Sequence, residues 1–144
     1  MIADSVVLIH ACATSAMVGV IWFVQLVHYP LMSYVTGPAF SNFETEHQRR
    51  TTWIVAPLML VEAAAAIYIL FIPQVITPAI AWLGATSLTC IWLSTFLWQV
   101  PCHRRLEEAF DAQMHKRLVQ SNWLRTVLWT LRGGIACTML NFTS

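Results

Sequence analysis

The chain has 144 residues, of which 58% are hydrophobic and only 10% are charged, and its formal net charge is +1. A soluble domain carries about a quarter charged residues. This chain therefore has too few charges to cover a water-facing surface, and a lipid bilayer is its expected surrounding. Because it has no basic excess to neutralise phosphates, nucleic-acid binding is excluded. The length allows a single domain, residues 1–144.

Hydropathy predicts an all-α fold, an integral membrane four-helix bundle. A helix needs roughly 20 apolar residues to cross the hydrocarbon layer. Stretches of this kind cover residues 5–28, 51–71, 77–100 and 122–140. The link from Ile72 to Ile76 is short, so the helices on either side of it should be antiparallel neighbours. The first apolar run is longer than a signal-peptide core and follows no basic segment, so we expect it to be retained.

The basic residues predict the orientation of the chain. Of the eight, six lie in the two longer loops: Arg49, Arg50, Arg104, Arg105, Lys116 and Arg117. The positive-inside rule then places both long loops in the cytoplasm and both termini outside, as expected for a bacterial inner-membrane protein.

Each long loop is expected to hold an amphipathic helix lying on the membrane surface. In the first loop, Phe40, Phe43 and His47 recur at helical spacing. In the second, an apolar residue recurs every four positions from Leu106 to Leu118. Each half is then a spanning helix, a proline, a surface helix and a second spanning helix. This order indicates either a parallel two-helix repeat or similar hydropathy without duplication.

Ionisable groups inside spanning helices require an explanation, because each costs roughly 2.5–3.5 kcal/mol on insertion scales. Glu62 lies 11 residues after Thr51, and Arg132 lies 10 residues after Asn122. The two helices enter from the same side, so the charges lie at similar depth. We expect a Glu62–Arg132 ion pair, which either fixes the register of the helices or lines a polar cavity.

The last predicted helix carries a polar stripe. Asn122, Arg125, Trp129 and Arg132 are three or four residues apart and therefore share one face. Two arginines and an amide suit a small anionic or quinone-like ligand, although Arg125 could instead extend to the interface. The candidate catalytic residues are Glu62, Arg132, Arg125 and Asn122.

A candidate metal site lies on the cytoplasmic side, formed by His28, Glu44, His47 and His103. Glu44 and His47 have the ExxH spacing, which places both on one helix face and is a ligand pair in di-iron carboxylate bundles. Imidazole and carboxylate groups suit a transition metal such as iron, zinc or copper. A chance occurrence of the short motif is the alternative.

His10 stands apart from the other histidines, near the opposite surface. A single imidazole in a spanning helix either bonds to a neighbouring helix or serves as an axial ligand of a b-type haem. His10 is accordingly the candidate cofactor-binding residue.

Two resemblances follow from short motifs. The segment Val100-Pro-Cys-His-Arg-Arg-Leu, followed by Asn122-Trp-Leu-Arg-Thr and Trp129-Thr-Leu-Arg, resembles the anthrone-oxygenase-like family of small four-helix membrane proteins. This resemblance covers the chain from Val100 onward and implies that Asn122 and Arg125 are functional positions. His10, with the later Trp22-Phe-Val-Gln-Leu-Val-His-Tyr-Pro-Leu, is similar to the opening of the haem-containing membrane protoporphyrinogen oxidases. That likeness implies a haem held by His10, partnered in the family by a lysine in a later spanning helix.

Taken together, the sequence predicts a membrane oxidoreductase with a metal or haem cofactor, a polar site that opens to the cytoplasmic side, and assembly into homo-oligomers. One alternative is a non-enzymatic accessory or assembly subunit of a membrane complex, in which the ion pair is architectural. Another is a small proton-coupled transport module with Glu62 as the proton carrier.

Overall fold

The computed structural model describes residues 2–71 and 77–141, and every regular element in these ranges is a helix. The predicted all-α fold is thus confirmed for this part of the chain. The first half contains α1 (Ile2–Phe23), the π-helical turn η1 (Val24–His28), α2 (Tyr29–Met32) and α3 (Ala39–Leu70). The second half contains α4 (Pro78–Ser94), the π-helical turn η2 (Thr95–Gln99), α5 (Val100–Glu108) and α6 (Ala112–Leu140).

Within the described ranges, three continuous helical stretches are long and apolar enough to cross a membrane. They are Ile2–Met32, Ala39–Leu70 and Pro78–Glu108. The helix α6, which contains the predicted span 122–140, is not among them, in keeping with the charge that Arg125 and Arg132 bring to it.

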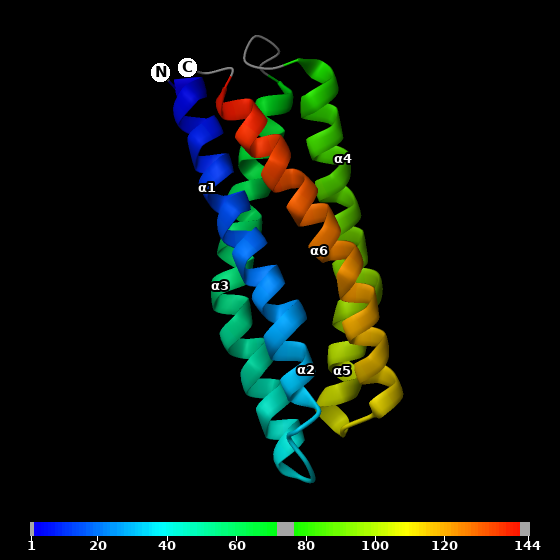
Figure 1. Ribbon diagram of the computed structural model, residues 1–144. Coiled ribbons are helices and arrows are strands. Elements are labelled where there is room, and N and C mark those ends of the chain that lie inside the picture. Colours follow the sequence, from blue (N-terminus) through cyan, green and yellow to red (C-terminus); the bar gives the residue numbers. More distant parts are fainter. Residues whose placement is uncertain (1, 72–76, 142–144) are drawn as a thin grey trace.

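The helices lie side by side along their length (Figure 1). The helix α1 packs against α3 and α6, and α4 packs against the same two helices. The beginning of α1 and the end of α6 lie at one end of the molecule, whereas the α2–α3 and α5–α6 turns lie at the other (Figure 1). The predicted link from Ile72 to Ile76 falls outside the described residues.

The two predicted surface helices are not separate elements, so that prediction was wrong. The first belongs to α3, which runs unbroken from Ala39 to Leu70. The second predicted helix is split into two parts. Its first part is α5, which continues the helical rod formed by α4 and η2, and its second part is the beginning of α6 at Ala112. Asp111 caps α6, because its side chain accepts hydrogen bonds from the backbone amides of Gln113 and Met114 at 2.8 and 3.0 Å.

The apolar stripe of these loop segments packs against protein. Phe40 of α3, Leu106 of α5 and Leu118 of α6 are fully buried in one cluster with Tyr29 and Met32. An amphipathic pattern predicts a buried face without saying whether lipid or another helix covers it. Here neighbouring helices cover it, and the cluster holds the turn end of the molecule together.

The π-helical turns interrupt the first rod of each half at matching places, just before Pro30 and Pro101. Proline lacks an N–H, and its ring crowds the carbonyl four residues earlier, so the preceding turn widens. The amide of Tyr29 consequently bonds to the carbonyl of Val24, and the amide of Val100 to that of Thr95. Each half therefore has a long helix, a π-helical turn, a short helix and a second long helix, which is the order that the predicted parallel repeat requires.

Candidate functional site

Glu62 and Arg132 form the centre of a buried polar network. The Arg132 Nε donates a hydrogen bond to Glu62 Oε1 at 2.8 Å, and the two side chains are 1% and 0% exposed. The same oxygen accepts a bond from Thr14 Oγ1 at 2.8 Å. Glu62 Oε2 accepts one from Trp129 Nε1 at 3.1 Å. The predicted pair is therefore present, and both carboxylate oxygens have partners.

The remaining donors of Arg132 are also engaged. Its Nη1 donates to the Gly84 carbonyl, and its Nη2 lies 3.0 Å from His10 Nε2. The network thus joins α1, α3, α4 and α6 at one level. Because its ionic groups are satisfied, it has the properties of a structural network that fixes helix register.

The contacts of His10 do not suit the predicted haem ligand. The side chain is 2% exposed, and its Nε2 faces the Arg132 guanidinium. On the Nε2 side, a cation that is itself paired with Glu62 occupies the place that a haem iron would take, while Nδ1 is buried without a hydrogen-bond partner. The Nε2 contact corresponds to the other predicted role of His10, a bond to a neighbouring helix.

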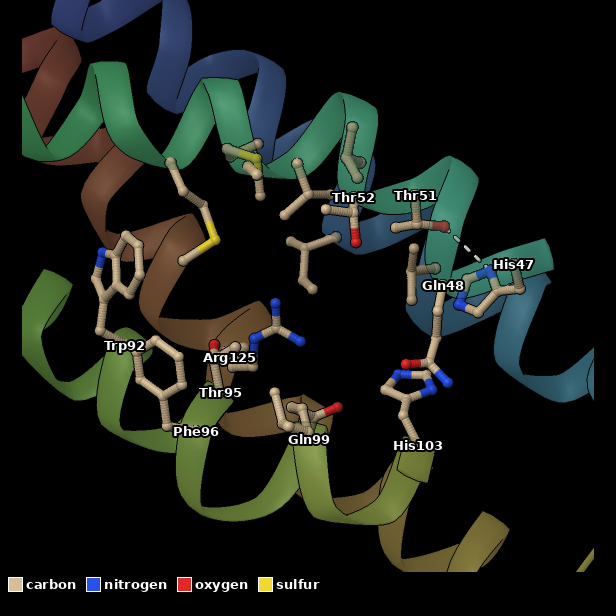
Figure 2. A pocket seen from close by; sticks show the side chains of 18 of the residues that line it. His47, Gln48, Thr51, Thr52, Trp92, Thr95, Phe96, Gln99, His103 and Arg125 are labelled. Atoms are coloured by element: carbon tan, nitrogen blue, oxygen red, sulfur yellow. Dashed lines mark hydrogen bonds between the residues drawn. The ribbon is translucent and has the colours of Figure 1, made fainter. Parts of the chain in front are cut away.

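A cavity of about 320 Å³ lies between α3 and the α4–η2–α5 rod. Figure 2 shows Thr52, Thr51 and Gln48 on one wall and Trp92, Phe96 and Gln99 on the other. Its lining changes along its length. One end is apolar, with Met17, Met59 and Trp92, and the other is polar, with Gln48, His47 and His103. An amphipathic occupant would match this gradient.

Arg125 of α6 reaches into this cavity (Figure 2) although its side chain is only 7% exposed. Its Nη1 donates to Asn122 Oδ1 at 3.1 Å, and its guanidinium lies 5.1 Å from the centroid of the Trp129 ring. Its Nε is buried without a hydrogen-bond partner. Among the described residues, no carboxylate pairs with Arg125. A buried cation without a counterion is costly unless an anion joins it.

A chain of hydrogen bonds leads from a buried carboxylate to the cavity. Glu44 Oε1 lies 2.5 Å from His103 Nδ1, and His103 Nε2 lies 3.0 Å from the Tyr29 hydroxyl. The Tyr29 hydroxyl also interacts with the Arg125 guanidinium. If the carboxylate holds the proton on Nδ1, Nε2 is free to accept the Tyr29 proton. We call Glu44, His103 and Tyr29 the relay.

Two glutamines and an asparagine position these groups. Gln99 Oε1 lies 3.4 Å from the Tyr29 hydroxyl, and the Asn122 amide donates to Gln25 Oε1 at 2.8 Å. Asn122 thus holds Arg125 with its oxygen and Gln25 with its nitrogen. Its role is to orient Arg125.

The four predicted metal ligands lie together, but the structure does not support the metal site. The rings of His28 and His47 stack with centroids 4.1 Å apart, and His47 Nδ1 lies 3.1 Å from Thr51 Oγ1. Both ring nitrogens of His103 belong to the relay. Across residues 2–71 and 77–141, no three His, Cys, Asp or Glu side chains are arranged to hold a metal ion. Stacking brings the imidazoles close without directing their nitrogens at a common point.

Sequence reasoning missed Tyr29, which with His103 is one of the two relay residues that border the cavity. A tyrosine near the end of a spanning helix fits an aromatic belt, so its type carries no special signal. The available signal was the Tyr29-Pro30 pair, because proline induces a π turn and such turns are frequent at functional sites.

Comparisons with known protein families, with curated proteins and with solved structures found no match. The likenesses to the anthrone-oxygenase-like family and to membrane protoporphyrinogen oxidases stay predictions. The chemistry of the site must therefore be argued from Arg125, the relay and the cavity that they border.

Proposed function

We propose that this chain is an integral membrane four-helix bundle that binds an amphipathic ligand with an acidic oxygen and exchanges a proton with it. Three apolar stretches support the membrane location. The helix α6 would be the fourth span, because Arg125 and Arg132 are buried inside the bundle and do not face lipid. The turn end would lie in the cytoplasm, because the positive-inside rule favours that side for the basic residues of the loops.

The observation that carries the proposal is that Arg125 is buried without a carboxylate partner and at the same time borders a cavity. A ligand oxygen that carries negative charge would supply the missing counterion. The apolar end of the cavity would hold the rest of the molecule. A phenol, a quinol or a hydroxyquinone has both properties, and this ligand class agrees with the anionic or quinone-like ligand predicted from sequence.

The relay would supply the proton transfer. With Glu44 orienting His103, the imidazole can accept the Tyr29 proton while Tyr29 takes one from the ligand oxygen. Arg125 stabilises the resulting anion. In this step the ligand hydroxyl loses its proton to Tyr29 and Tyr29 loses its own to His103, without a change of oxidation state. The predicted oxidoreductase would need an electron acceptor in addition to these residues. No metal or haem takes part in this proposal.

The second candidate is a non-enzymatic binding or accessory protein. The closed Glu62–Arg132 network favours it, because a carboxylate with both oxygens bonded and no exposure is architectural. The same closure argues against Glu62 as the carrier of a proton-coupled transport module. Rapid proton exchange with the bound ligand, lost on disabling the relay, would distinguish the enzyme from a passive binder.

Binding of a 3-alkyl-2-hydroxy-1,4-naphthoquinone, an acidic and coloured probe, tests the proposal. The protein in lipid nanodiscs is titrated, and quenching of tryptophan fluorescence reports occupancy. We expect Arg125→Met to weaken binding about 10- to 100-fold, because a hydrogen bond to a charged group contributes about 1.5–3 kcal/mol. The matched control is Arg104→Met, which removes an exposed arginine of α5.

Equal affinity of the two variants and the unmodified protein would refute the proposal. Thermal unfolding of each variant shows whether it is folded. Weaker binding by a folded Arg125→Met protein, with unchanged binding by Arg104→Met, supports the assignment of the anion site.

A further inference from the structure

A second hollow of about 280 Å³ lies between α3 and α4 next to the cavity, and we call the two spaces together the groove. Trp92 lines both spaces, and Figure 2 shows its ring at the apolar end of the first. The other lining residues of the second hollow are Ala63, Ala66, Ile67, Leu70, Ala85, Leu88 and Thr89.

The second hollow offers no polar group to an occupant. Its side chains are aliphatic apart from Trp92 and Thr89, and Thr89 Oγ1 already donates to the Ala85 carbonyl at 2.9 Å. Alanines on both walls leave room where larger side chains would interlock. The space therefore suits a flexible hydrocarbon chain.

We infer that the ligand is a single-tailed, long-chain amphiphile whose tail runs past Trp92 into the second hollow. This inference rests on the proposed function, in which the acidic head lies at Arg125. The lining of the groove becomes less polar from His103 through Met59 to Leu88, as the ligand does from head to tail. From Ala63 to Leu70 the helix adds about 10 Å of groove, at 1.5 Å per residue.

A neighbouring hollow provides the competing route for a tail. It lies between α1–η1 and α3 and shares five lining residues with the cavity: Val20, Val24, His47, Thr51 and Val55. Gly19, Phe23 and Ile54 line it away from the cavity. The imidazoles of His28 and His47 also line it, so a tail there would lie beside polar groups, which the second hollow does not offer. The route past Trp92 keeps apolar groups in contact with apolar groups throughout.

Photolabelling tests the inference, because a bilayer is as apolar as the groove and affinity alone would report little about the tail. Two 3-alkyl-2-hydroxy-1,4-naphthoquinone probes are used in nanodiscs. One carries a diazirine beside the ring, and the other carries it at the end of a long alkyl tail. Labelled residues are identified by mass spectrometry of the full-length protein.

We expect the ring probe to label residues 48–59 and 92–103, and the tail probe to label residues 63–70 and 85–92. Tail labelling at Gly19, Phe23 or Ile54, or spread evenly over lipid-facing positions, would overturn the tail route while leaving the head site intact. Failure of the ring probe to label the cavity would overturn the proposed function and the inference with it.

A variant pair adds a second measurement. Ala63→Phe fills the second hollow and should reduce tail labelling there several-fold while ring labelling is unchanged. Leu60→Phe adds the same type of side chain at a position of α3 that is 61% exposed, and should change neither. If Ala63→Phe does not fold, Ala85→Phe fills the hollow from the opposite wall. Unchanged tail labelling in the folded variant would contradict the inference.

Discussion

Arg125 and Arg132 share one buried face of α6 about two turns apart, yet only Arg132 is paired with a carboxylate. Arg132 is bound by Glu62, Gly84 and His10, whereas Arg125 keeps an unpartnered Nε beside a cavity. Two residues of the same type on one helix therefore have different roles. One orders the bundle, and the other is available to a ligand.

Arg132→Met should destabilise the fold by about 3–5 kcal/mol, because it leaves the buried Glu62 carboxylate without its counterion. Arg125→Met removes an unpaired buried charge and should leave the free energy of unfolding nearly unchanged or raise it. Denaturant unfolding in micelles measures both, with Arg104→Met as the control. Similar losses for the two buried arginines would contradict the division of roles.

Removing both members of the ion pair should be less harmful than removing one. Glu62→Gln alone leaves Arg132 buried and unpaired, and we expect a loss of about 3–5 kcal/mol. The double variant Glu62→Gln/Arg132→Met should recover much of that loss, since neither charge remains. A double-mutant cycle on unfolding free energies gives the coupling directly. Additive losses would show that the pair does not act as a unit.

The relay should control the rate of proton exchange with the bound ligand. Glu44→Gln keeps the size of the side chain but removes the charge that orients His103, so proton release on probe binding should slow about 100-fold, within the range for general acid–base catalysis. Stopped-flow mixing with a pH-indicator dye, at a pH below the pKa of the free probe so that the probe enters in its protonated form, measures the rate. Glu46→Gln, at an exposed carboxylate of the same helix, is the control and should match the unmodified protein.

The charge of Arg125 should lower the pH at which the bound probe changes from its anionic to its protonated form. A nearby cation favours the anionic form of an acidic ligand. The coloured anion should therefore persist to lower pH in the unmodified protein than in Arg125→Met, at probe concentrations that saturate both. Visible spectra recorded across a pH titration give the two midpoints. Coincident midpoints would place the ligand oxygen away from Arg125.

Metal removal should leave the protein unchanged, because His28, Glu44, His47 and His103 lie together without three of them being arranged to hold a metal ion. We expect dialysis against a chelator, or addition of zinc, to leave the unfolding temperature and probe affinity unaltered. A rise in stability with one equivalent of a transition metal would restore the metal site that the sequence predicted.

The sequence predicted the Glu62–Arg132 pair because helix rise alone gives the depth of a residue in a spanning helix. It did not predict how the histidines meet, since residue type and spacing carry no information on ring orientation. The prediction of two surface helices in the loops was wrong for a related reason. Periodicity at Phe40 and Leu106 indicates a buried face, but only tertiary contacts decide that protein covers it.

The widened turn before Pro30 amounts to a one-residue insertion in an otherwise regular helix. One extra residue rotates everything downstream by about 100°, since a regular turn holds 3.6 residues. Upstream, Met17 and Ile21 point into the core; downstream, Tyr29 meets His103. Deleting a single residue from the widened turn would swing Tyr29 away from its neighbours while preserving the upstream packing. A length change of one residue, with no change in chemistry, would then disrupt both the relay and the turn-end cluster that contains Tyr29 and Met32.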